Sequence, residues 1–314
     1  MSTGEGRFTH HRMTRAMQAI AGRLDVATTG WQLLRLTNNA VFALPEAGLV
    51  IRITRSHGLH ERVRKVVRLG SWFEGAGAPT IRLAPGVVQP IAVDGLLASV
   101  WTYLPPRDPE PTTEDLGRVL RRFHGLPMAP GVPSLPELPR WDPVGDARTR
   151  LDDAEALDDN DRAGLVQWCD DLQPRLDALL ERTEPALIHG DAHVGNLLRA
   201  PADEGADVVL CDFDATCRGP RQVDLVAVAV GEIRFARPGA HRTLAAAYGV
   251  DVTADPDWAL LREARELKMV AAAVPLLASS AGVAEEFRTR LASARDRDDE
   301  VRWTPFADVS RRQG

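Results

Sequence analysis

Cysteine, net charge and long apolar runs are all scarce in this sequence. Its 314 residues include three cysteines, an odd and sparse set that argues against a disulfide framework and favours a reducing, cytoplasmic compartment. The formal net charge is −6, whereas nucleic-acid-binding proteins carry a basic surface. The longest weakly charged run, 269–284, is short for a membrane span and contains Pro275. We therefore expect neither nucleic acid nor a membrane as a partner.

Two further absences concern the N-terminus and the nucleotide-binding motifs. The start of the chain has no apolar core, so it is not expected to be a signal peptide. No G-x-G-x-x-G occurs, which excludes a glycine loop of that type. What the chain does have is 44% hydrophobic residues, enough for a large core and about two domains. Its many arginines and alanines suggest a bacterial protein from a GC-rich genome.

The segment 186–224 combines apolar runs with polar residues suited to phosphate chemistry. A short apolar run leads into His189-Gly190-Asp191, and Asn196 follows soon after. The apolar run Val208–Cys211 predicts a buried strand, which ends in Asp212-Phe213-Asp214. Phosphoryl transfer needs metal ions at the nucleotide phosphates and a residue that orients the attacking hydroxyl. Mg²⁺ prefers oxygen ligands and usually takes only one or two carboxylates.

The pattern H-G-D-x-H-x-x-N-L followed by D-F-D is similar to the signature of the aminoglycoside phosphotransferase family, a branch of the protein-kinase-like fold. This resemblance implies that Asp191 is the catalytic base or the residue that orients the hydroxyl. It also implies that Asn196 and Asp212 are the magnesium ligands. The supporting residues that it implies are His189, which braces the catalytic loop, His193, whose role the motif leaves open, Asp214, and the buried Asp224 of the following helix.

Two alternatives explain the same loop differently. The alternation of His189, Asp191 and His193 is compatible with the zinc cluster of a metallohydrolase. Asparagine is a poor zinc ligand, however, and no further histidine lies near enough in sequence to complete a familiar zinc pattern. A purely structural polar loop is the second alternative, because a motif match is only a hypothesis.

The N-terminal part predicts strands that cover a nucleotide. Two short strands within 31–44 are separated by a polar turn at Thr37-Asn38-Asn39. The resemblance places Asn39 in the nucleotide-positioning loop, and an ordinary hairpin turn is the alternative. The next strand, 49–53, contains Arg52 where a kinase has the lysine that holds the α- and β-phosphates. The alternative for Arg52 is an edge-strand arginine that reaches solvent.

A helix over 59–73 and a strand over 96–104 complete the expected N-terminal part. In the family this helix carries a glutamate that pairs with the strand cation, and the best candidate is Glu61. The usual place of that acid is occupied by Lys65 or Val66, so the ion pair is in doubt. The resemblance places adenine near the end of the 96–104 strand, with Trp101 or Tyr103 against it. The alternative is that both aromatic residues belong to the core.

The run 152–161 is rich in aspartate and glutamate. In the family, inserted helices of this region form the acceptor side of the site, and an acidic wall there would attract a polycation. The alternative is a helix start, where acidic residues interact favourably with the helix dipole.

We therefore expect an α+β, bilobal protein-kinase-like fold with a small β-rich N-lobe and a larger, mostly helical C-lobe. The N-lobe is expected over 1–104, the C-lobe over 105–294, and an exposed charged tail, a candidate for disorder, over 295–314. The acceptor and the oligomeric state are not specified by the sequence.

The expected function is an ATP-dependent phosphotransferase that moves the γ-phosphate to a hydroxyl of a small molecule. The acceptor candidates are an aminoglycoside-type antibiotic, another sugar or an amino-alcohol, with cationic molecules among them. ATP, with GTP as the alternative, and Mg²⁺ are the expected cofactors. The rival functions are a non-catalytic nucleotide-binding protein and a protein kinase. The second is disfavoured because no A-P-E segment follows Asp214 and because Gly190 replaces the arginine of H-R-D.

Overall fold

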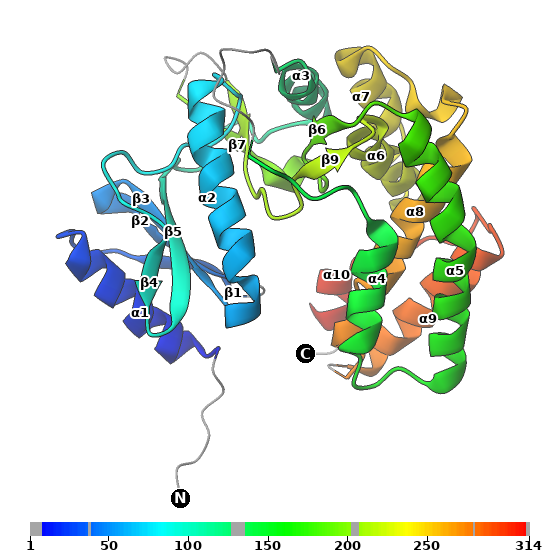
Figure 1. Cartoon of the computed structure of the whole chain (residues 1–314), viewed down its shortest axis with the longest axis horizontal. Coiled ribbons are helices and arrows are strands. Elements are labelled where there is room, and N and C mark those ends of the chain that lie inside the picture. Colours follow the sequence, from blue (N-terminus) through cyan, green and yellow to red (C-terminus); the bar gives the residue numbers. More distant parts are fainter. Residues whose placement is uncertain (1–7, 37–38, 127–135, 202–206, 279, 312–314) are drawn as a thin grey trace, which may run out of the picture. The chain divides into compact units, whose positions relative to one another are not determined.

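The computed structural model describes residues 8–36, 39–126, 136–201, 207–278 and 280–311. It divides into two compact units (Figure 1). Unit 1 comprises Met1–Pro111, Gly125–Leu138 and Gly195–Ala215, and unit 2 comprises Thr112–His124, Pro139–Val194 and Thr216–Gly314. Each unit is therefore assembled from segments that are far apart in sequence.

Unit 1 is built on a five-stranded antiparallel sheet with the strand order β1-β2-β3-β5-β4. A separate hairpin, β7 with β8, joins the unit because backbone hydrogen bonds connect Leu210 to Pro79 and Ile81. Of the predicted turn, Thr37 and Asn38 lie outside the described residues, and Asn39 begins β2. The elements are α1 His10–Arg23, β1 Gln32–Leu36, β2 Asn39–Leu44, β3 Leu49–Thr54, α2 His60–Gly75, β4 Ile91–Val93, β5 Leu96–Thr102, β7 Leu197–Arg199 and β8 Val208–Leu210.

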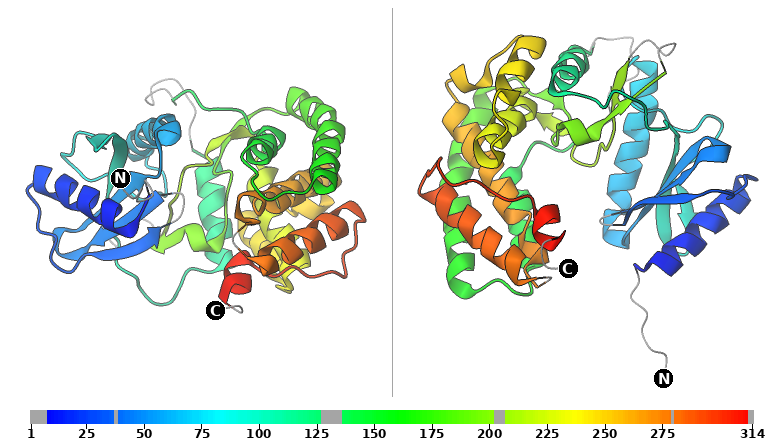
Figure 2. Two further views of the ribbon diagram at one scale, coloured as in Figure 1. Left: turned by 90° about the horizontal axis from the view of Figure 1, so that it is seen from below. Right: turned by 180° about the vertical axis from the view of Figure 1, so that it is seen from behind.

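The two faces of the five-stranded sheet are covered by different helices (Figure 2). Side chains alternate along a strand, and Ile51, Ile53 and Val100 pack with the apolar side of α1 in one core. Leu97 has the opposite parity and packs with Val63 of α2. Arg52 lies between Ile51 and Ile53, so its side chain is on the α2 face of the sheet.

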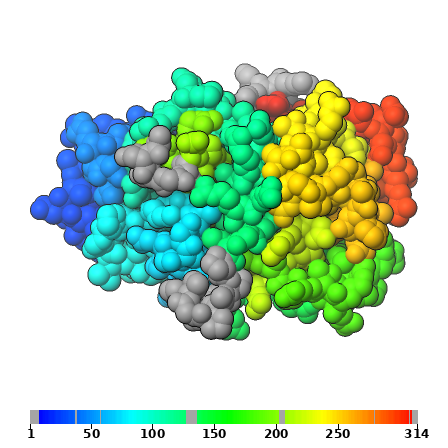
Figure 3. All heavy atoms as spheres, turned by 90° about the horizontal axis from the view of Figure 1, so that it is seen from above, coloured from blue at the N-terminus to red at the C-terminus, as the bar shows by residue number. Residues whose placement is uncertain are grey.

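Unit 2 is mostly helical, with one short antiparallel pair formed by β6 and β9. Helix α7 lies at the surface of the unit, where Figure 3 shows its segment in yellow. The elements are α3 Thr113–His124, α4 Pro143–Asp152, α5 Asp159–Arg182, β6 Ala186–Ile188, β9 Cys217–Gly219, α6 Gln222–Phe235, α7 Ala240–Tyr248, α8 Trp258–Ala271, α9 Ala281–Arg295 and α10 Phe306–Arg311. In the described part of the chain, no helix has the length and apolar character needed to cross a membrane.

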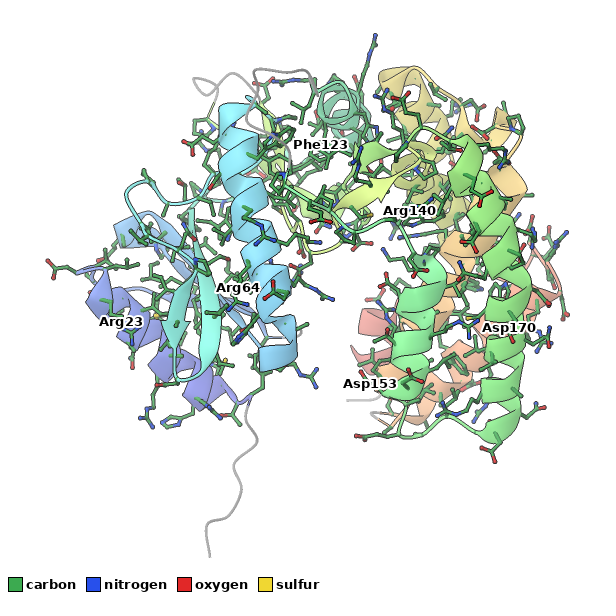
Figure 4. All side chains as sticks on the ribbon, in the orientation of Figure 1. Arg23, Arg64, Phe123, Arg140, Asp153 and Asp170 are labelled. Carbon is green, nitrogen blue, oxygen red and sulfur yellow. The ribbon has the colours of Figure 1, made fainter. Side chains whose placement is uncertain are left out.

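The acidic run 152–161 occupies helix ends. Asp153, labelled in Figure 4, is the C-cap residue of α4. Asp158 is the N-cap residue of α5, and its carboxylate accepts a hydrogen bond from the backbone N–H of Asp161 at 2.8 Å. Carboxylates are favourable at such N-termini because they accept hydrogen bonds from free backbone N–H groups. The helix-start alternative therefore accounts for Asp158, Asp159 and Asp161, whereas Asp152 and Asp153 lie at the C-terminal end of α4.

The segment from the end of α9 onward combines an exposed charged run, residues 295–300, with a buried part around Trp303. Trp303 is buried, and its indole N–H donates to Ser293 Oγ at 3.0 Å. The guanidinium groups of Arg234 and Arg290 stack over the Trp303 ring at 4.7 and 5.2 Å from its centre. The charge run is therefore exposed as its composition predicts, while Trp303 beyond it is held in the core of unit 2 by ring and cation contacts.

Candidate active site

The loop Asp212-Phe213-Asp214 follows β8 in unit 1 and is fixed by its central residue. Phe213 is buried, with its ring centre 4.8 Å from that of Phe73 on α2 and 6.1 Å from that of Trp101 on β5. Asp212 has φ +64°, a left-handed conformation that is uncommon for residues other than glycine and often occurs at functional sites. The aromatic contacts of Phe213 thus stabilise a loop that presents two carboxylates.

Arg52 of β3 contacts both of these carboxylates. Its Nη2 atom lies 2.5 Å from Asp214 Oδ2 and 3.2 Å from Asp212 Oδ1. Burial alone would lower the pKa of Arg52, but the negative charges of Asp214 and Asp212 raise it, so the guanidinium stays charged. Its side chain is 15% exposed on a strand that lies between β2 and β5. This placement excludes the alternative of an edge-strand arginine that reaches solvent.

Two further residues of the sheet extend this group. Asn39, the first residue of β2, donates from Nδ2 to Asp214 Oδ2 at 3.4 Å. Arg35 of β1, a residue that was not singled out from the sequence, donates from Nη1 to Asp212 Oδ2 at 3.3 Å. Three neighbouring strands therefore direct polar side chains toward the loop after β8.

A backbone hydrogen bond connects Asn196 to Cys211, the residue directly before this loop. Asn196 ends a 3-10 turn, Val194–Asn196, directly before β7, and its carbonyl oxygen accepts a hydrogen bond from the N–H of Cys211 at 2.9 Å. The pairing of β7 with β8 thus brings an asparagine and the Asp212 carboxylate into the same region of unit 1. This pair offers the amide and carboxylate oxygens that suit Mg²⁺.

Helix α2 contacts the loop through Lys65 and not through Glu61. Lys65 Nζ donates to the carbonyl oxygen of Asp214 at 2.7 Å. Glu61 is 80% exposed and pairs with Arg64, which Figure 4 labels on the same helix. The ion pair between Glu61 and Arg52 that the resemblance suggested is therefore absent from the described contacts, and Asp212 and Asp214 take its place.

The two aromatic residues near the end of β5 differ in their surroundings. Trp101 is 3% exposed, and its indole N–H donates to Ser99 Oγ at 2.8 Å. It contacts Phe213 and belongs to the core, as the alternative for this residue expected. Tyr103 is half-buried, and its backbone N–H donates to Gly48 O at 2.8 Å.

In unit 2, a buried carboxylate determines the conformation of the loop after β6. Asp224, near the start of α6, accepts hydrogen bonds from the backbone N–H groups of His189 at 2.7 Å and of Gly190 at 2.8 Å. His124 Nε2 lies 2.9 Å from the same carboxylate, and His124 Nδ1 lies 2.8 Å from the Tyr248 hydroxyl. Burial would raise the pKa of Asp224, but these hydrogen bonds and the two histidines lower it.

Asp191 projects from this loop and has a carboxylate that is 41% exposed. Its Oδ1 atom lies 3.4 Å from Lys268 Nζ and 3.4 Å from Arg265 Nη1, both on α8. Lys268 also donates to Gly190 O at 2.7 Å. Burial would raise the pKa of Asp191, but the positive charges of Lys268 and Arg265 hold it well below its usual range. The carboxylate is therefore ionised at any physiological pH.

The two histidines of the motif have different environments. His189 is buried, and its Nδ1 atom accepts a hydrogen bond from the N–H of Asp191 at 3.3 Å. His193 is exposed, with Nε2 at 3.9 Å from Asp191 Oδ2. Among the described residues, no group of three or more histidine, cysteine, aspartate and glutamate side chains is placed to hold a metal ion.

Sequence reasoning thus identified most polar residues of both loops but missed several of their partners. Lys268 and Arg265 were visible only as two of several charged residues without a distinguishing spacing. Lys65 occupies the place where the resemblance expects a glutamate, and this difference was the one indication in the sequence that α2 contacts the loop in another way. His124 and Tyr248 are far from the motif in sequence, and no local pattern indicated them.

Comparisons with known proteins identify a family and several solved structures to which this chain is similar. The model of a family described as "Phosphotransferase enzyme family" matches residues 34–264. Among solved structures, the GDP and kanamycin complex of APH(2")-IIia has 16% sequence identity and a TM-score of 0.62, and the match covers 92% of this chain and 100% of that chain. The search of curated protein sequences gives no significant match.

Two further solved structures are similar over most of their length. A spectinomycin phosphotransferase, APH(9)-Ia, in complex with ADP and spectinomycin, has 12% identity and a TM-score of 0.55, covering 89% of this chain and 91% of that chain. The choline kinase LicA from Streptococcus pneumoniae has 12% identity and a TM-score of 0.60, covering 90% of this chain and 99% of that chain. These likenesses confirm the protein-kinase-like fold expected from the sequence.

Proposed function

We propose that this chain, which belongs to the phosphotransferase enzyme family, transfers the γ-phosphoryl group of ATP to a hydroxyl of a small molecule. The observation that carries the proposal is the presentation of Asp191. Asp191, whose carboxylate is partly exposed, directly follows His189 and Gly190, and the backbone N–H groups of these two residues donate to the fully buried Asp224. Such a fixed loop is what an in-line transfer requires, because positioning supplies most of the rate in this chemistry.

The nucleotide would contact the polar group of unit 1. Arg52 would neutralise phosphate charge, Asn39 would position the phosphates, and the segment that ends β5, including Tyr103, would lie near the base. Asn196 and Asp212 would hold Mg²⁺, which supplies charge neutralisation at the phosphates when bound. ATP is the preferred proposal and GTP the alternative, since similar proteins have been solved with ADP and with GDP.

Asp191 would hold the acceptor hydroxyl in line with the phosphorus and accept its proton. A carboxylate with a depressed pKa is a weak general base. This weakness is tolerable in phosphoryl transfer, where the transition state is loose and little covalent chemistry is required of the protein. The orienting hydrogen bond is therefore the main contribution that we assign to Asp191.

The test compares Asp191→Asn with Asp170→Asn, a control that removes an exposed carboxylate of α5 in the same unit. We expect Asp191→Asn to lower turnover by about 10²–10⁴-fold, the range of an acid–base and orienting residue. Its affinity for Mg²⁺·ATP, measured by calorimetry, should stay near that of the wild type. The control should keep both properties. Wild-type turnover in Asp191→Asn would refute the proposed mechanism.

A non-catalytic nucleotide-binding protein is the second candidate. The observation that favours it is the departure at α2, where Lys65 contacts the Asp214 carbonyl and where, among the described residues, no glutamate pairs with Arg52. This candidate predicts Mg²⁺·ATP binding without phosphoryl transfer to any acceptor. Measuring ADP release across a panel of alcohols separates the two functions directly.

A further inference from the structure

Two cations of α8 lie beside the carboxylate of Asp191. Arg265 and Lys268 are three residues apart on the helix, so their side chains project from the same face. Both approach the same oxygen, Asp191 Oδ1, at 3.4 Å. One of them, Lys268, has a second and shorter hydrogen bond to Gly190 O at 2.7 Å. Lys268 is therefore engaged with the backbone of the loop as well as with the carboxylate.

Arg265 is the less satisfied of the two cations. Its side chain is only 18% exposed, and a guanidinium has five N–H donors in a planar fork. Within the described part of the chain, Asp191 Oδ1 is the one hydrogen-bond acceptor of Arg265, and its buried Nε has none. Buried donors without partners are costly, so nearly all of them in folded proteins are paired. Arg265 thus has donors available for a ligand.

The charges around this pair are balanced, with Arg265 and Lys268 facing the carboxylates of Asp191 and, on α4, Asp146. The two glutamates of α8 are engaged elsewhere, because Glu263 binds Arg175 and Trp168, and Glu266 binds Arg234 and Arg262. Within the acidic run 152–161, Asp158, Asp159 and Asp161 lie at the start of α5. A polycationic acceptor would therefore meet two positive side chains next to Asp191.

We propose that Arg265 and Lys268 form a binding site for an anionic group, a carboxylate or a phosphate, on the same acceptor molecule whose hydroxyl Asp191 orients. The inference rests on the proposed function and names a substrate class for it: hydroxy acids, hydroxy amino acids and phosphorylated alcohols. Lys268 is held by Asp191 and by the carbonyl oxygen of Gly190, so Arg265, whose buried Nε has no partner among the described residues, supplies the main contact to the anionic group. The planar fork of arginine matches the two oxygens of a carboxylate or phosphate.

The test uses pairs of alcohols that differ by one anionic group. Three pairs differ by a carboxylate: L-serine and ethanolamine, L-threonine and 1-amino-2-propanol, and glycerate and ethylene glycol. The fourth pair, glycerol 3-phosphate and glycerol, differs by a phosphate. Binding is measured as the rise in melting temperature in the presence of Mg²⁺ and a non-hydrolysable ATP analogue, and transfer is measured as ADP release with ATP. The variants are Arg265→Gln and the control Arg175→Gln, which removes a half-exposed arginine that contacts Glu263.

We expect at least one anionic alcohol to raise the melting temperature of the wild type more than its uncharged or cationic counterpart does. The wild type should also phosphorylate that alcohol in preference to the counterpart. Arg265→Gln should raise the KM for that acceptor by about 10- to 100-fold, the factor for loss of a hydrogen-bonded ion pair, with a smaller change in kcat. Arg175→Gln should retain the wild-type preference. Arg265→Lys, which retains the charge but loses the fork, should recover part of the affinity.

Four results would overturn the inference. In the first, no anionic alcohol of the panel stabilises the wild type, and in the second the preference survives in Arg265→Gln. In the third, Arg265→Gln lowers kcat equally for anionic and uncharged acceptors, which would assign Arg265 to the transferred phosphoryl group instead. In the fourth, the wild type transfers phosphate only to uncharged or cationic alcohols, which would refute the inference and leave the proposed function intact. Stabilisation by an anionic alcohol without any transfer would refute the proposed function and leave the anion site intact.

Discussion

Asp224 is the residue on which the loop of Asp191 most depends. Its carboxylate accepts two backbone hydrogen bonds and contacts His124, and a neutral amide cannot satisfy the same donors. Asp224→Asn should lower the free energy of unfolding by about 1–3 kcal/mol for each buried donor left unpaired. Urea denaturation at neutral pH measures this loss. The exposed control Asp170→Asn should change stability by less than about 1 kcal/mol, and equal stability of the two variants would contradict the assignment.

The stabilisation by Asp224 should also depend on pH in a defined direction. Its pKa is lower in the folded state than in the unfolded chain, so its contribution is complete above the unfolded value, about 4. The contribution is lost as the pH falls from there through the folded value. The difference in unfolding free energy between wild type and Asp224→Asn should thus shrink below about pH 4. A difference that stays constant down to about pH 3 would exclude this linkage.

Arg52 and Arg35 offer a matched comparison, because both contact Asp212 but differ in burial. The side chain of Arg52 is 15% exposed and that of Arg35 is 54% exposed. Charge-assisted hydrogen bonds are worth ~1.5–3 kcal/mol, whereas exposed ion pairs are worth ~0–1 kcal/mol. Arg52→Gln should therefore raise the KM for ATP by about 10- to 100-fold, and Arg35→Gln by about fivefold at most.

Steady-state kinetics with ATP and acceptor varied separately would check this comparison. The KM for the acceptor should change little in either variant, because Arg52 and Arg35 contact the loop after β8 and belong to the proposed nucleotide group. An effect of Arg52→Gln confined to the acceptor would remove Arg52 from that group.

Lys65 connects helix α2 to the loop after β8. The family resemblance instead implied that a glutamate of this helix pairs with Arg52. Lys65→Met keeps the length of the side chain but loses the hydrogen bond to Asp214 O. We expect it to raise the KM for ATP by about 10-fold or more, as for loss of a charged donor. Glu61→Gln, an exposed change on the same helix, should leave the KM for ATP at the wild-type value, measured by the same steady-state kinetics, and should change stability by no more than about 0.5 kcal/mol. If both variants behave alike, Lys65 does not support the loop.

The strands and loops that bear the motifs were largely predictable, and their long-range partners were not. The apolar run 208–211 and the acidic residues after it follow local rules of periodicity, so the β8 strand and its loop were expected at nearly the observed positions. The cation of β3 was also expected. Its partner was not, because the pairing of Arg52 with Asp212 and Asp214 depends on residues that are distant in sequence.

The same limit applies to unit 2. The sequence indicated Asp191 and Asp224 through a motif, but His124, Arg265 and Lys268 reach that loop from α3 and α8. Tertiary packing alone decides which charged residue of a helix faces such a loop. In the 295–314 segment, the composition rule predicted the exposure of residues 295–300, but it could not indicate the burial of Trp303.

The melting temperature of the whole chain should depend on metal and nucleotide together, because the residues proposed to bind them both lie in unit 1. Asp191, which is assigned to the acceptor, lies in unit 2. A ligand that binds only the folded state stabilises it by ~2.7 kcal/mol at 100 times its dissociation constant. We expect a non-hydrolysable ATP analogue with Mg²⁺ to raise the melting temperature. Chelation of Mg²⁺ by EDTA should remove most of that increase, because the phosphates then lose the ion that joins them to Asn196 and Asp212.

Two carboxylate variants, one in each unit, test which carboxylate the rise in melting temperature depends on. Asp212→Asn should lose most of the increase in melting temperature with Mg²⁺ and the analogue, since an amide oxygen is a weaker ligand than a carboxylate for a hard cation. Asp191→Asn should keep the full increase, because Asp191 is assigned to the acceptor. Melting curves of the three proteins, each with and without EDTA, measure both effects in one experiment. An increase that is unchanged in Asp212→Asn would refute the metal assignment, and a loss in Asp191→Asn would place that carboxylate among the nucleotide ligands.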